Sequence, residues 1–351
     1  MNWTQQLGLK FPILQAPMAG AQGVAMAAAV SNAGGLGAIP SALLSSDALD
    51  DALREFRRAT SNASSAAVNL NFFTHVNPPD DAAAQARWRK GLAAYYTEFG
   101  VTPPTAAGAG RNPFDAACCE VLEHHQPEVV SFHFGLPETA LLKRVKAWGA
   151  IVLSSATTVE EAVWLEAHGA DVIIAQGLEA GGHRGMFLTQ DITTQIGTLA
   201  LLPQVIDAVS VPVIAAGGIC SPRAVSAAIA LGASAVQCGT AFLCCPESLI
   251  NDLHRDKLTS EQARHTALTN LHTGRPARGI VNRLMRELGP MSALPPAFPQ
   301  AAGALAGLRS AAEASGRSDF TPLWAGQDTS GCRPVPAAEQ LQWLAEALPS
   351  S

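Results

Sequence analysis

Short apolar runs recur along this chain roughly every 20 to 35 residues, and a stretch with helical periodicity follows each of them. Repeated strand–helix units of this kind predict a parallel sheet, because a parallel strand can begin only after a crossover connection has carried the chain back. Eight runs are predicted strands: residues 12–15, 36–39, 67–71, 129–132, 150–153, 172–175, 213–215 and 235–237.

The helical stretches between these strands carry recognisable start signals. Residues 46–58, 158–168 and 221–231 are predicted helices. Thr158 can cap its helix, and Glu161 three residues later completes a capping-box pattern. Ser221 followed by Pro222 is a similar start, with proline at the first helical position.

The first strand–helix turn distinguishes a closed barrel from an open sheet. An open dinucleotide-binding sheet usually carries the spacing G-x-G-x-x-G after its first strand. Residues 15–20 do not fit that spacing, and neither do the later glycine-rich segments 34–37 and 108–110. We therefore expect an α/β fold of the (β/α)₈, or TIM, barrel type.

The chain of 351 residues is longer than a minimal barrel requires. Residues 1–245 are the predicted barrel, and they include a long insertion, 72–111, after the third strand. Since that insertion follows the carboxyl end of a strand, we expect it to form a cap over the active-site face. Residues 246–351 are predicted to be a mainly helical region that completes the barrel and forms a wall of the substrate site.

Charge and cysteine usage exclude several classes of protein. The net charge of −6, without a basic stripe, argues against a nucleic-acid partner. The start of the chain lacks the pattern of a signal peptide, and no apolar run is long enough to cross a membrane, so a cytoplasmic protein is expected. The seven cysteines show neither a disulfide framework nor zinc-ligand spacing, and we predict no metal site.

Glycines follow the last two predicted strands, where TIM barrels often bind phosphate. Gly217 and Gly218 follow the seventh strand, and Gly239 and Thr240 follow the eighth. Glycine allows backbone N–H groups to approach an anion closely, and the threonine hydroxyl adds a donor. Each pair alone could be an ordinary tight turn, but their occurrence at these two strand ends favours a phosphate site.

Polar side chains at other strand ends suit a flavin. The amides of Asn69 and Gln176 can both donate and accept, as the pyrimidine edge of a flavin requires, although either could instead satisfy a loop backbone. His183 lies in the glycine-rich loop 176–185 and could face a ligand or be structural. His133, at the end of the fourth strand, has the same two interpretations: a contact to ligand or cofactor, or a partner for buried backbone.

The segments 12–18, 131–137, 176–185, 215–219, 237–240, 273–279 and 323–327 together resemble those of nitronate monooxygenases, a family formerly called 2-nitropropane dioxygenase. The resemblance covers almost the whole chain and is weakest in 72–111. It implies a TIM barrel with one non-covalent FMN and O₂ as co-substrate. The implied reaction oxidises an alkyl nitronate, such as propionate 3-nitronate, to a carbonyl compound and nitrite, which is a detoxifying activity.

The resemblance also implies roles for individual residues. His183 would be the catalytic histidine. Substrate contacts are expected at His183 and, from its position at a strand end, at His133. The FMN contacts would fall on Ala16, Pro17, Met18, Asn69, Gln176, Gly181, Gly217, Gly218, Gln237, Cys238, Gly239 and Thr240.

One departure from the family pattern concerns the substrate. Family members that act on small acidic nitronates often have tyrosines in the C-terminal wall, whereas this chain has only Tyr95 and Tyr96, and has Phe298 in the segment 295–299. The alternatives are a flavin-dependent enoyl-ACP reductase that uses NAD(P)H, a flavin-free phosphate-binding isomerase or lyase, and a non-catalytic flavin sensor. A monomer or a homodimer is expected.

Overall fold

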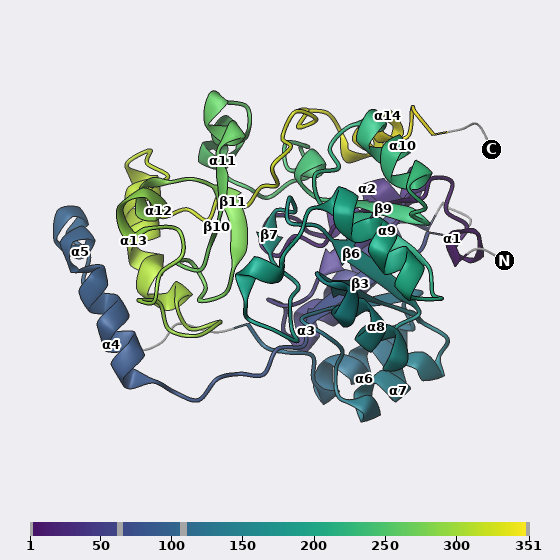
Figure 1. Ribbon diagram of the computed structural model, residues 1–351, viewed down its shortest axis with the longest axis horizontal. Coiled ribbons are helices and arrows are strands. Elements are labelled where there is room, and N and C mark those ends of the chain that lie inside the picture. The colour runs from purple at the N-terminus through teal and green to yellow at the C-terminus, as the bar shows by residue number, and fades with distance from the viewer. Residues whose placement is uncertain (1–2, 62–65, 106–110, 349–351) are drawn as a thin grey trace.

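Eight parallel strands form a TIM barrel in the computed structural model, which describes residues 3–61, 66–105 and 111–348 (Figure 1). Their spatial order is β1-β9-β8-β6-β5-β4-β3-β2. A parallel bridge between Leu14 and Leu36 brings the two ends of that order together, so the sheet curls round on itself. Every predicted strand overlaps one observed: β1 (Ile13–Gln15), β2 (Gly37–Pro40), β3 (Val68–Phe73), β4 (Val129–His133), β5 (Ile151–Ala156), β6 (Val172–Gln176), β8 (Val213–Ala216) and β9 (Ala235–Cys238).

The inward face of the strands changes character along the barrel axis. Successive side chains of a strand alternate between its two faces. Near the amino ends, Leu14, Leu36 and Leu153 fill the interior with other aliphatic residues, and Trp3 closes the bottom. Further toward the carboxyl ends, several of these strands carry polar side chains on the same face. These polar residues are Asn69, Asn71, Ser131, Ser155, Gln176 and Gln237. The barrel therefore has an apolar base and a polar mouth.

Helices surround the barrel and cover the outward, aliphatic faces of the strands. The helix α14, near the end of the chain, contacts α2 and α10 and so closes the ring. The surrounding helices are α2 (Val24–Asn32), α3 (Ser46–Ala59), α6 (Ala116–His125), α7 (Thr139–Ala147), α8 (Val159–Ala167), α9 (Thr198–Ala208), α10 (Pro222–Ala230) and α14 (Ala337–Leu344), with the short α1 (Trp3–Gln6) at the base.

The predicted helix starts are confirmed, with one change. Ser221 accepts a hydrogen bond from the backbone N–H of Ala224, and Pro222 opens α10. Thr158 likewise accepts from the N–H of Glu161. The return half of the capping box is wrong: the buried Glu161 carboxylate accepts from the N–H of Thr157 at 2.7 Å and from the N–H of Phe187 at 2.6 Å. Glu161 thus joins α8 to the loop after β6, because its side chain is long enough to satisfy two buried backbone segments.

The C-terminal part of the chain forms a second lobe beside the mouth of the barrel (Figure 1). Its three-stranded sheet combines β10 (Thr266–Thr269) and β11 (Ala277–Ile280) with β7 (Gly182–His183), which belongs to the loop after β6. The sequence did not predict this sheet, because its strands are only two to four residues long and leave no clear alternation of apolar and polar residues. The lobe also contains α11 (Asp252–Leu258), α12 (Arg283–Leu288) and α13 (Ala302–Ala314); the 3₁₀ turns of the chain are η1 (Ile192–Thr194), η2 (Thr240–Phe242) and η3 (Glu261–Arg264).

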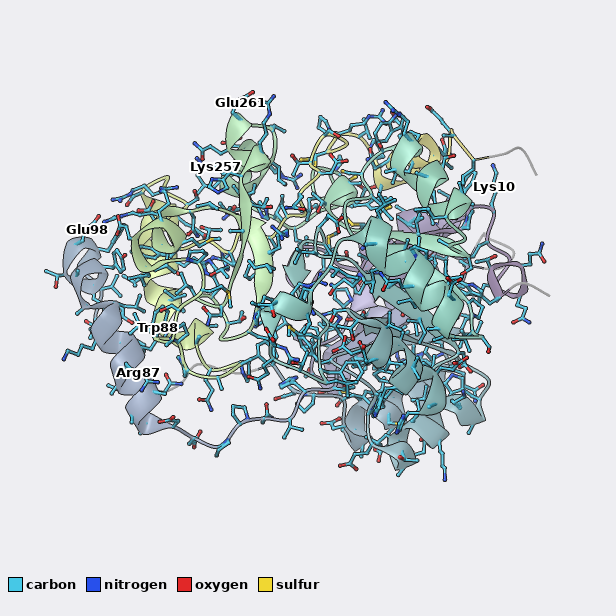
Figure 2. All side chains as sticks on the ribbon, viewed as in Figure 1. Lys10, Arg87, Trp88, Glu98, Lys257 and Glu261 are labelled. Carbon is cyan, nitrogen blue, oxygen red and sulfur yellow. The ribbon has the colours of Figure 1, made fainter. Side chains whose placement is uncertain are left out.

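The insertion after β3 packs on this lobe. Its two helices, α4 (Ala82–Gly91) and α5 (Ala93–Phe99), lie at the outer edge of the molecule, beyond α13 (Figure 1). Trp88, labelled in Figure 2, donates to the carbonyl of Ala301 at 3.0 Å, and the Tyr96 hydroxyl donates to the carbonyl of Ala304 at 2.7 Å. No residue of α4 or α5 lines the cavity described below. These helices therefore brace the lobe from outside.

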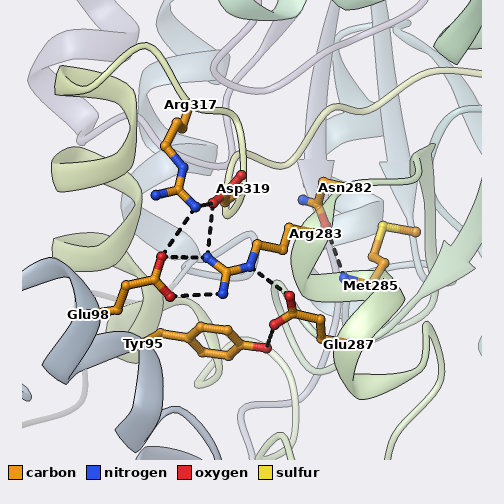
Figure 3. A network of polar contacts seen from close by, with 8 residues as sticks. All are labelled: Tyr95, Glu98, Asn282, Arg283, Met285, Glu287, Arg317 and Asp319. Atoms are coloured by element: carbon orange, nitrogen blue, oxygen red, sulfur yellow. Dashed lines mark hydrogen bonds and ion pairs between the residues drawn. The ribbon is translucent and has the colours of Figure 1, made fainter.

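An ion-pair network joins α5 to α12 (Figure 3). Arg283 bonds both carboxylate oxygens of Glu98, at 2.7 and 2.8 Å, and also the carboxylate of Glu287. Tyr95 donates to Glu287 at 2.8 Å, and Arg317 bridges Glu98 and Asp319. Because most of these groups are partly exposed, each pair contributes little to stability, and the network mainly fixes how α5 sits on the lobe. Among the helices of the described residues, none is both long and apolar enough to span a bilayer.

Candidate active site

A cavity of about 510 Å³ lies at the carboxyl ends of the barrel strands, between the barrel and the C-terminal lobe. This volume falls within the roughly 300–1,000 Å³ that is usual for small-molecule sites. All of the predicted site residues except Asn69 and Cys238 line it: Ala16, Pro17, Met18, His133, Gln176, Gly181, His183, Gly217, Gly218, Gln237, Gly239 and Thr240.

Asn69 and Cys238 occupy different positions. Asn69 lies one layer deeper in the barrel, and neither atom of its buried amide has a hydrogen-bond partner among the described residues. Asn71, two positions along the same face, reaches the cavity instead and donates to Ser131 Oγ at 2.9 Å. The side chain of Cys238 faces the surrounding helices, while its carbonyl accepts from the N–H of Ala16 at 2.8 Å.

His183 lies on β7, and its ring is held by residues from both lobes. Its Nε2 atom is 2.9 Å from Thr273 Oγ1 in the C-terminal lobe. Its own carbonyl accepts from Gln176 Nε2 at 3.0 Å and is 3.2 Å from His133 Nε2. Antiparallel pairing with Ala277 fixes the backbone of β7. The histidine is therefore positioned by its backbone as well as by its side chain.

Gln176 and His133 both support the loop that carries His183. Gln176 Oε1 accepts from the N–H of Gly185 at 2.7 Å, so the amide of Gln176, at the start of the loop, binds the backbone on both sides of Arg184 at its end. For His133, a carbonyl can only accept, so Nε2 carries the proton and Nδ1 accepts from the Ser155 hydroxyl, 3.1 Å away. Burial lowers the pKa of His133 to about 3. The contacts of His133 satisfy buried backbone, which was one of its two sequence interpretations.

The side chain of Arg184 binds the backbone at the start of the same loop. It is fully buried and donates to the carbonyls of Gln176 and Gly177, both at 2.6 Å, and to Gln195 Oε1 at 2.9 Å. Burial lowers its pKa to about 9, so the guanidinium remains charged at neutral pH. This residue binds the backbone at the start of the loop, and it does not line the cavity.

Aromatic rings form the wall around His183. The ring centroid of Phe298 lies 5.4 Å from that of His183, and the centroid of Trp324 lies 5.7 Å from it. Phe73 and Phe134 pack against each other, with centroids 4.9 Å apart, and each lies 6.1 Å from His183. This part of the cavity is consequently apolar and excludes much of the surrounding water.

Two arginines place positive charge on this aromatic wall. The Arg275 guanidinium lies 3.9 Å from the ring centroid of Phe134, and the Arg111 guanidinium lies 6.0 Å from that of Phe298. Arg111 Nε is buried without a hydrogen-bond partner among the described residues. Burial, followed by the charge of Arg111, lowers the pKa of His183 well below its usual value of 6.5. His183 is therefore neutral at pH 7, in surroundings suited to an anion.

The sequence did not identify Thr273, Arg275 or Arg111 as site residues, because the fold brings them to His183 from distant segments; Phe298 was noted only as part of the C-terminal wall. A glycine carries the only local signal. Gly274 has a φ of +90°, and a Cβ atom there would lie 2.2 Å from the carbonyl oxygen of Pro296. Only glycine permits this close approach, which brings Thr273 and Arg275 beside Phe298.

The first of the two predicted phosphate turns has backbone angles that favour glycine. Gly217 and Gly218 have φ values of +116° and +68°. A Cβ on Gly217 would lie 2.9 Å from Thr198 Oγ1, and one on Gly218 would lie 3.3 Å from the Cβ of Glu179. Thr240 Oγ1 already accepts from the N–H of Gly326 at 2.9 Å. Glycine at 217 and 218 is thus required by the backbone angle and leaves the N–H groups uncovered for an anion.

The residues of the cavity fit a flavin mononucleotide. Gln237, which lines the cavity, and Asn69, one layer below it, both have buried amide atoms without partners among the described residues. A buried amide of this kind is costly unless a ligand or water satisfies it, and the pyrimidine edge of a flavin offers the matching donors and acceptors. The glycine turns would receive the phosphate, and Ala16, Pro17 and Met18 form a neighbouring wall.

Comparisons with known proteins agree over the whole chain. A family model described as nitronate monooxygenase matches residues 2–346. A nitronate monooxygenase of Pseudomonas aeruginosa is 42% identical over 350 residues, which is 99% of each chain. A nitroalkane oxidase structure from Streptomyces ansochromogenes gives a TM-score of 0.88 at 37% identity and covers 98% of this chain and 97% of that one. FabK from Thermotoga maritima gives a TM-score of 0.71 at 28% identity, with 98% and 94% covered.

Proposed function

The chain belongs to the nitronate monooxygenase family, and from this premise we propose that it uses FMN and O₂ to oxidise alkyl nitronates, such as propionate 3-nitronate, to a carbonyl compound and nitrite. The observation that carries this proposal is a neutral histidine in an arginine-bearing aromatic wall, beside two glycine turns suited to phosphate. Bound FMN would supply the electron acceptor for the substrate and the route by which O₂ is reduced.

The surroundings of His183 suit an anionic substrate. A nitronate is already a resonance-stabilised carbanion, so its oxidation does not need a strong base. It does need a site that tolerates negative charge, and both Arg111 and Arg275 contribute to the lowered pKa of His183. The acidic residues of the cavity do not oppose them: Glu313 is engaged by Arg309 at 2.7 Å and by Thr321 at 2.8 Å, while Asp328 is bonded to Ser330.

The neutral imidazole can serve in two ways. It can bind the nitronate oxygen through one N–H group, or it can accept the α-proton of a neutral nitroalkane. The Thr273 hydroxyl contacts Nε2 of His183 and so sets the orientation of the imidazole ring. Gln176, His133 and Arg184 keep the loop in place while the substrate binds.

The test of this function is a visible spectrum of the purified protein, followed by aerobic nitrite release from propionate 3-nitronate and from alkyl nitronates. We expect a bound flavin and stoichiometric nitrite. Under anaerobic conditions, NADPH should leave the flavin oxidised, whereas the nitronate should bleach it. Rapid bleaching by NADPH would favour the enoyl-ACP reductase alternative. A colourless protein that cannot be reconstituted with FMN would favour an isomerase or lyase.

Arg111→Gln should lower kcat/KM for propionate 3-nitronate about 10- to 100-fold, since a hydrogen bond to a charged group contributes roughly 1.5–3 kcal/mol. The reason is that Arg111 lines the cavity with its guanidinium over Phe298, where it can bind the substrate carboxylate. With propyl-2-nitronate, which lacks a carboxylate, the loss should be at most about threefold. Steady-state nitrite release measures both values.

The matched control is Arg87→Gln, which removes an exposed arginine of α4 outside the cavity. This variant should behave as the wild type with both substrates. Equal losses for the two substrates in Arg111→Gln would show that Arg111 does not bind the carboxylate of propionate 3-nitronate.

A further inference from the structure

Thr198, the first residue of α9, lies behind the turn that follows β8 and does not line the cavity. Its hydroxyl oxygen is 2.9 Å from the carbonyl oxygen of Gly217 and 2.8 Å from Glu179 Oε2. A Cβ atom on Gly177 would lie 1.9 Å from the same hydroxyl oxygen, so only glycine leaves room for it there. The hydroxyl is therefore enclosed between the loop after β6 and the turn after β8.

The carboxylate of Glu179 holds the main chain of Thr198. Its two oxygens accept from the N–H of Thr198 at 3.0 and 2.8 Å. Gly197, the N-cap residue of α9, makes no side-chain cap, so Glu179 supplies an acceptor for the first N–H of the helix. This contact uses the backbone of Thr198, and capping of α9 therefore does not depend on the hydroxyl.

The contact between Thr198 and Gly217 sets the direction of the next N–H group. The peptide between Gly217 and Gly218 is trans, and the C=O and N–H groups of a trans peptide lie in one plane and point in opposite directions. Because the Gly217 carbonyl points toward Thr198, the Gly218 N–H points away from it. Gly218 lines the cavity, and its N–H has no hydrogen-bond partner among the described residues. The turn thus presents an unused donor on the side away from Thr198.

The single hydrogen of the Thr198 hydroxyl has two acceptors within hydrogen-bond distance, the Gly217 carbonyl and the Glu179 carboxylate. An anion bound to the Gly218 N–H polarises the peptide group and makes the Gly217 carbonyl a stronger acceptor. Donation from Thr198 to that carbonyl polarises the same peptide in the same direction. The two hydrogen bonds therefore strengthen each other across one peptide group.

We propose that Thr198 is a positioning residue for the cofactor phosphate, because its hydroxyl donates to the Gly217 carbonyl and so directs the Gly218 N–H at the phosphate. This inference rests on the proposed use of FMN, and it gives a role to a side chain outside the cavity. A purely structural role, in which the hydroxyl stabilises the start of α9, would affect the binding of every flavin equally. A role in phosphate binding affects only a flavin that carries the phosphate.

The test compares FMN with riboflavin, which has the same ring system and ribityl chain but no phosphate. Full-length protein freed of flavin is titrated with each compound, and the quenching of flavin fluorescence gives the two dissociation constants. Thr198→Val removes the hydroxyl and keeps the N–H of residue 198. We expect its Kd for FMN to rise about three- to tenfold, as for the loss of one hydrogen bond, while its Kd for riboflavin stays the same.

Two measurements on the flavin-loaded protein, as purified, support the titration. FMN should leave Thr198→Val faster than it leaves the wild type after dilution, which the recovery of free-flavin fluorescence records. The melting temperature of the flavin-free variant should match that of the flavin-free wild type, because the contact from Glu179 to the N–H of residue 198 remains.

Two further substitutions test the hydroxyl and the placement of its hydrogen. Thr198→Ser retains a hydroxyl and should restore the wild-type Kd for FMN. Glu179→Gln introduces an amide that can donate to Thr198 Oγ1, which leaves the Gly217 carbonyl as the acceptor for the hydroxyl hydrogen. This variant should bind FMN at least as tightly as the wild type. The matched control is Thr193→Val, which removes an exposed threonine hydroxyl 2.7 Å from the Asp191 carboxylate and should leave both constants unchanged.

The outcomes separate this inference from the proposed function. An unchanged Kd for FMN in Thr198→Val, or an equal rise for FMN and riboflavin, would overturn the role of Thr198 while leaving the use of FMN intact. Weaker FMN binding by Glu179→Gln would also contradict it. A wild-type protein that binds no FMN would contradict the proposed function, and this inference with it.

Discussion

Replacement of His183 by asparagine should leave the flavin bound and lower kcat/KM for propionate 3-nitronate about 100- to 10,000-fold, the usual contribution of a positioned acid–base group. The asparagine side chain can still donate a hydrogen bond, but it is shorter than that of histidine and its amide cannot accept a proton. The backbone of β7 should not change, because the contacts from Gln176 and His133 reach the carbonyl of residue 183 and not its side chain. The spectrum reports the flavin, and nitrite release reports turnover.

The pH profile gives the role of the ring. The pKa of His183 is lowered below 6.5, so the imidazole is neutral at pH 7 and becomes protonated only as the pH falls through that lowered value. If the ring accepts a proton, oxidation of a neutral nitroalkane should persist below pH 6.5 and then decline as the ring is protonated. His183→Asn should remove that decline together with the activity. An unchanged kcat/KM in His183→Asn, for nitronate and nitroalkane alike, would exclude this histidine from the mechanism.

Gly218→Val should yield a folded protein without flavin. At a φ of +68°, a β-branched residue is strained, and its Cβ would lie 3.3 Å from the Cβ of Glu179. The turn must then shift away from Glu179, and this shift should displace the backbone N–H groups that would bind the phosphate. The ratio of flavin to protein absorbance, before and after incubation with excess FMN, measures the loss.

Gly316→Val is the matched control for this substitution. Gly316 has a φ of +70°, and a Cβ there would meet nothing within 4 Å. It follows α13, outside the cavity, so the same backbone strain is introduced away from the ligand. We expect this variant to retain its flavin while losing some thermal stability. A fully flavin-loaded Gly218→Val protein would show that the turn does not bind the phosphate.

The barrel was predictable because its signals are local. Most of the strands are short apolar runs that end in polar or glycine residues, and a stretch with helical periodicity follows each strand. The parallel order then places all carboxyl ends at one mouth, which is why so many of the predicted residues line one cavity. Glycine at 217 and 218 was informative for the same reason, since the backbone angle alone demands it.

The aromatic wall around His183, with its two arginines, could not be predicted in the same way. Arg111 and Phe298 are brought together by the packing of the insertion and the C-terminal lobe, and nothing in their own sequence neighbourhoods indicates that contact. Gln176 presents a different case: its type suggested a cofactor contact, yet both ends of its amide bind the His183 loop. An amide at a strand end is equally suited to a ligand or to backbone, and only the geometry distinguishes the two.

The pairing of β7 with β11 bears on how the substrate specificity of such an enzyme can evolve. The glycine turns belong to the barrel, while Thr273 and Phe298, which contact the ring of His183, belong to the C-terminal lobe. Arg111 lies at the end of the insertion that packs on that lobe. Substitutions in these outer segments can alter which small molecule is accepted while the turns stay intact. The same barrel can thus keep one kind of chemistry and accept new substrates when its C-terminal lobe and its insertion change.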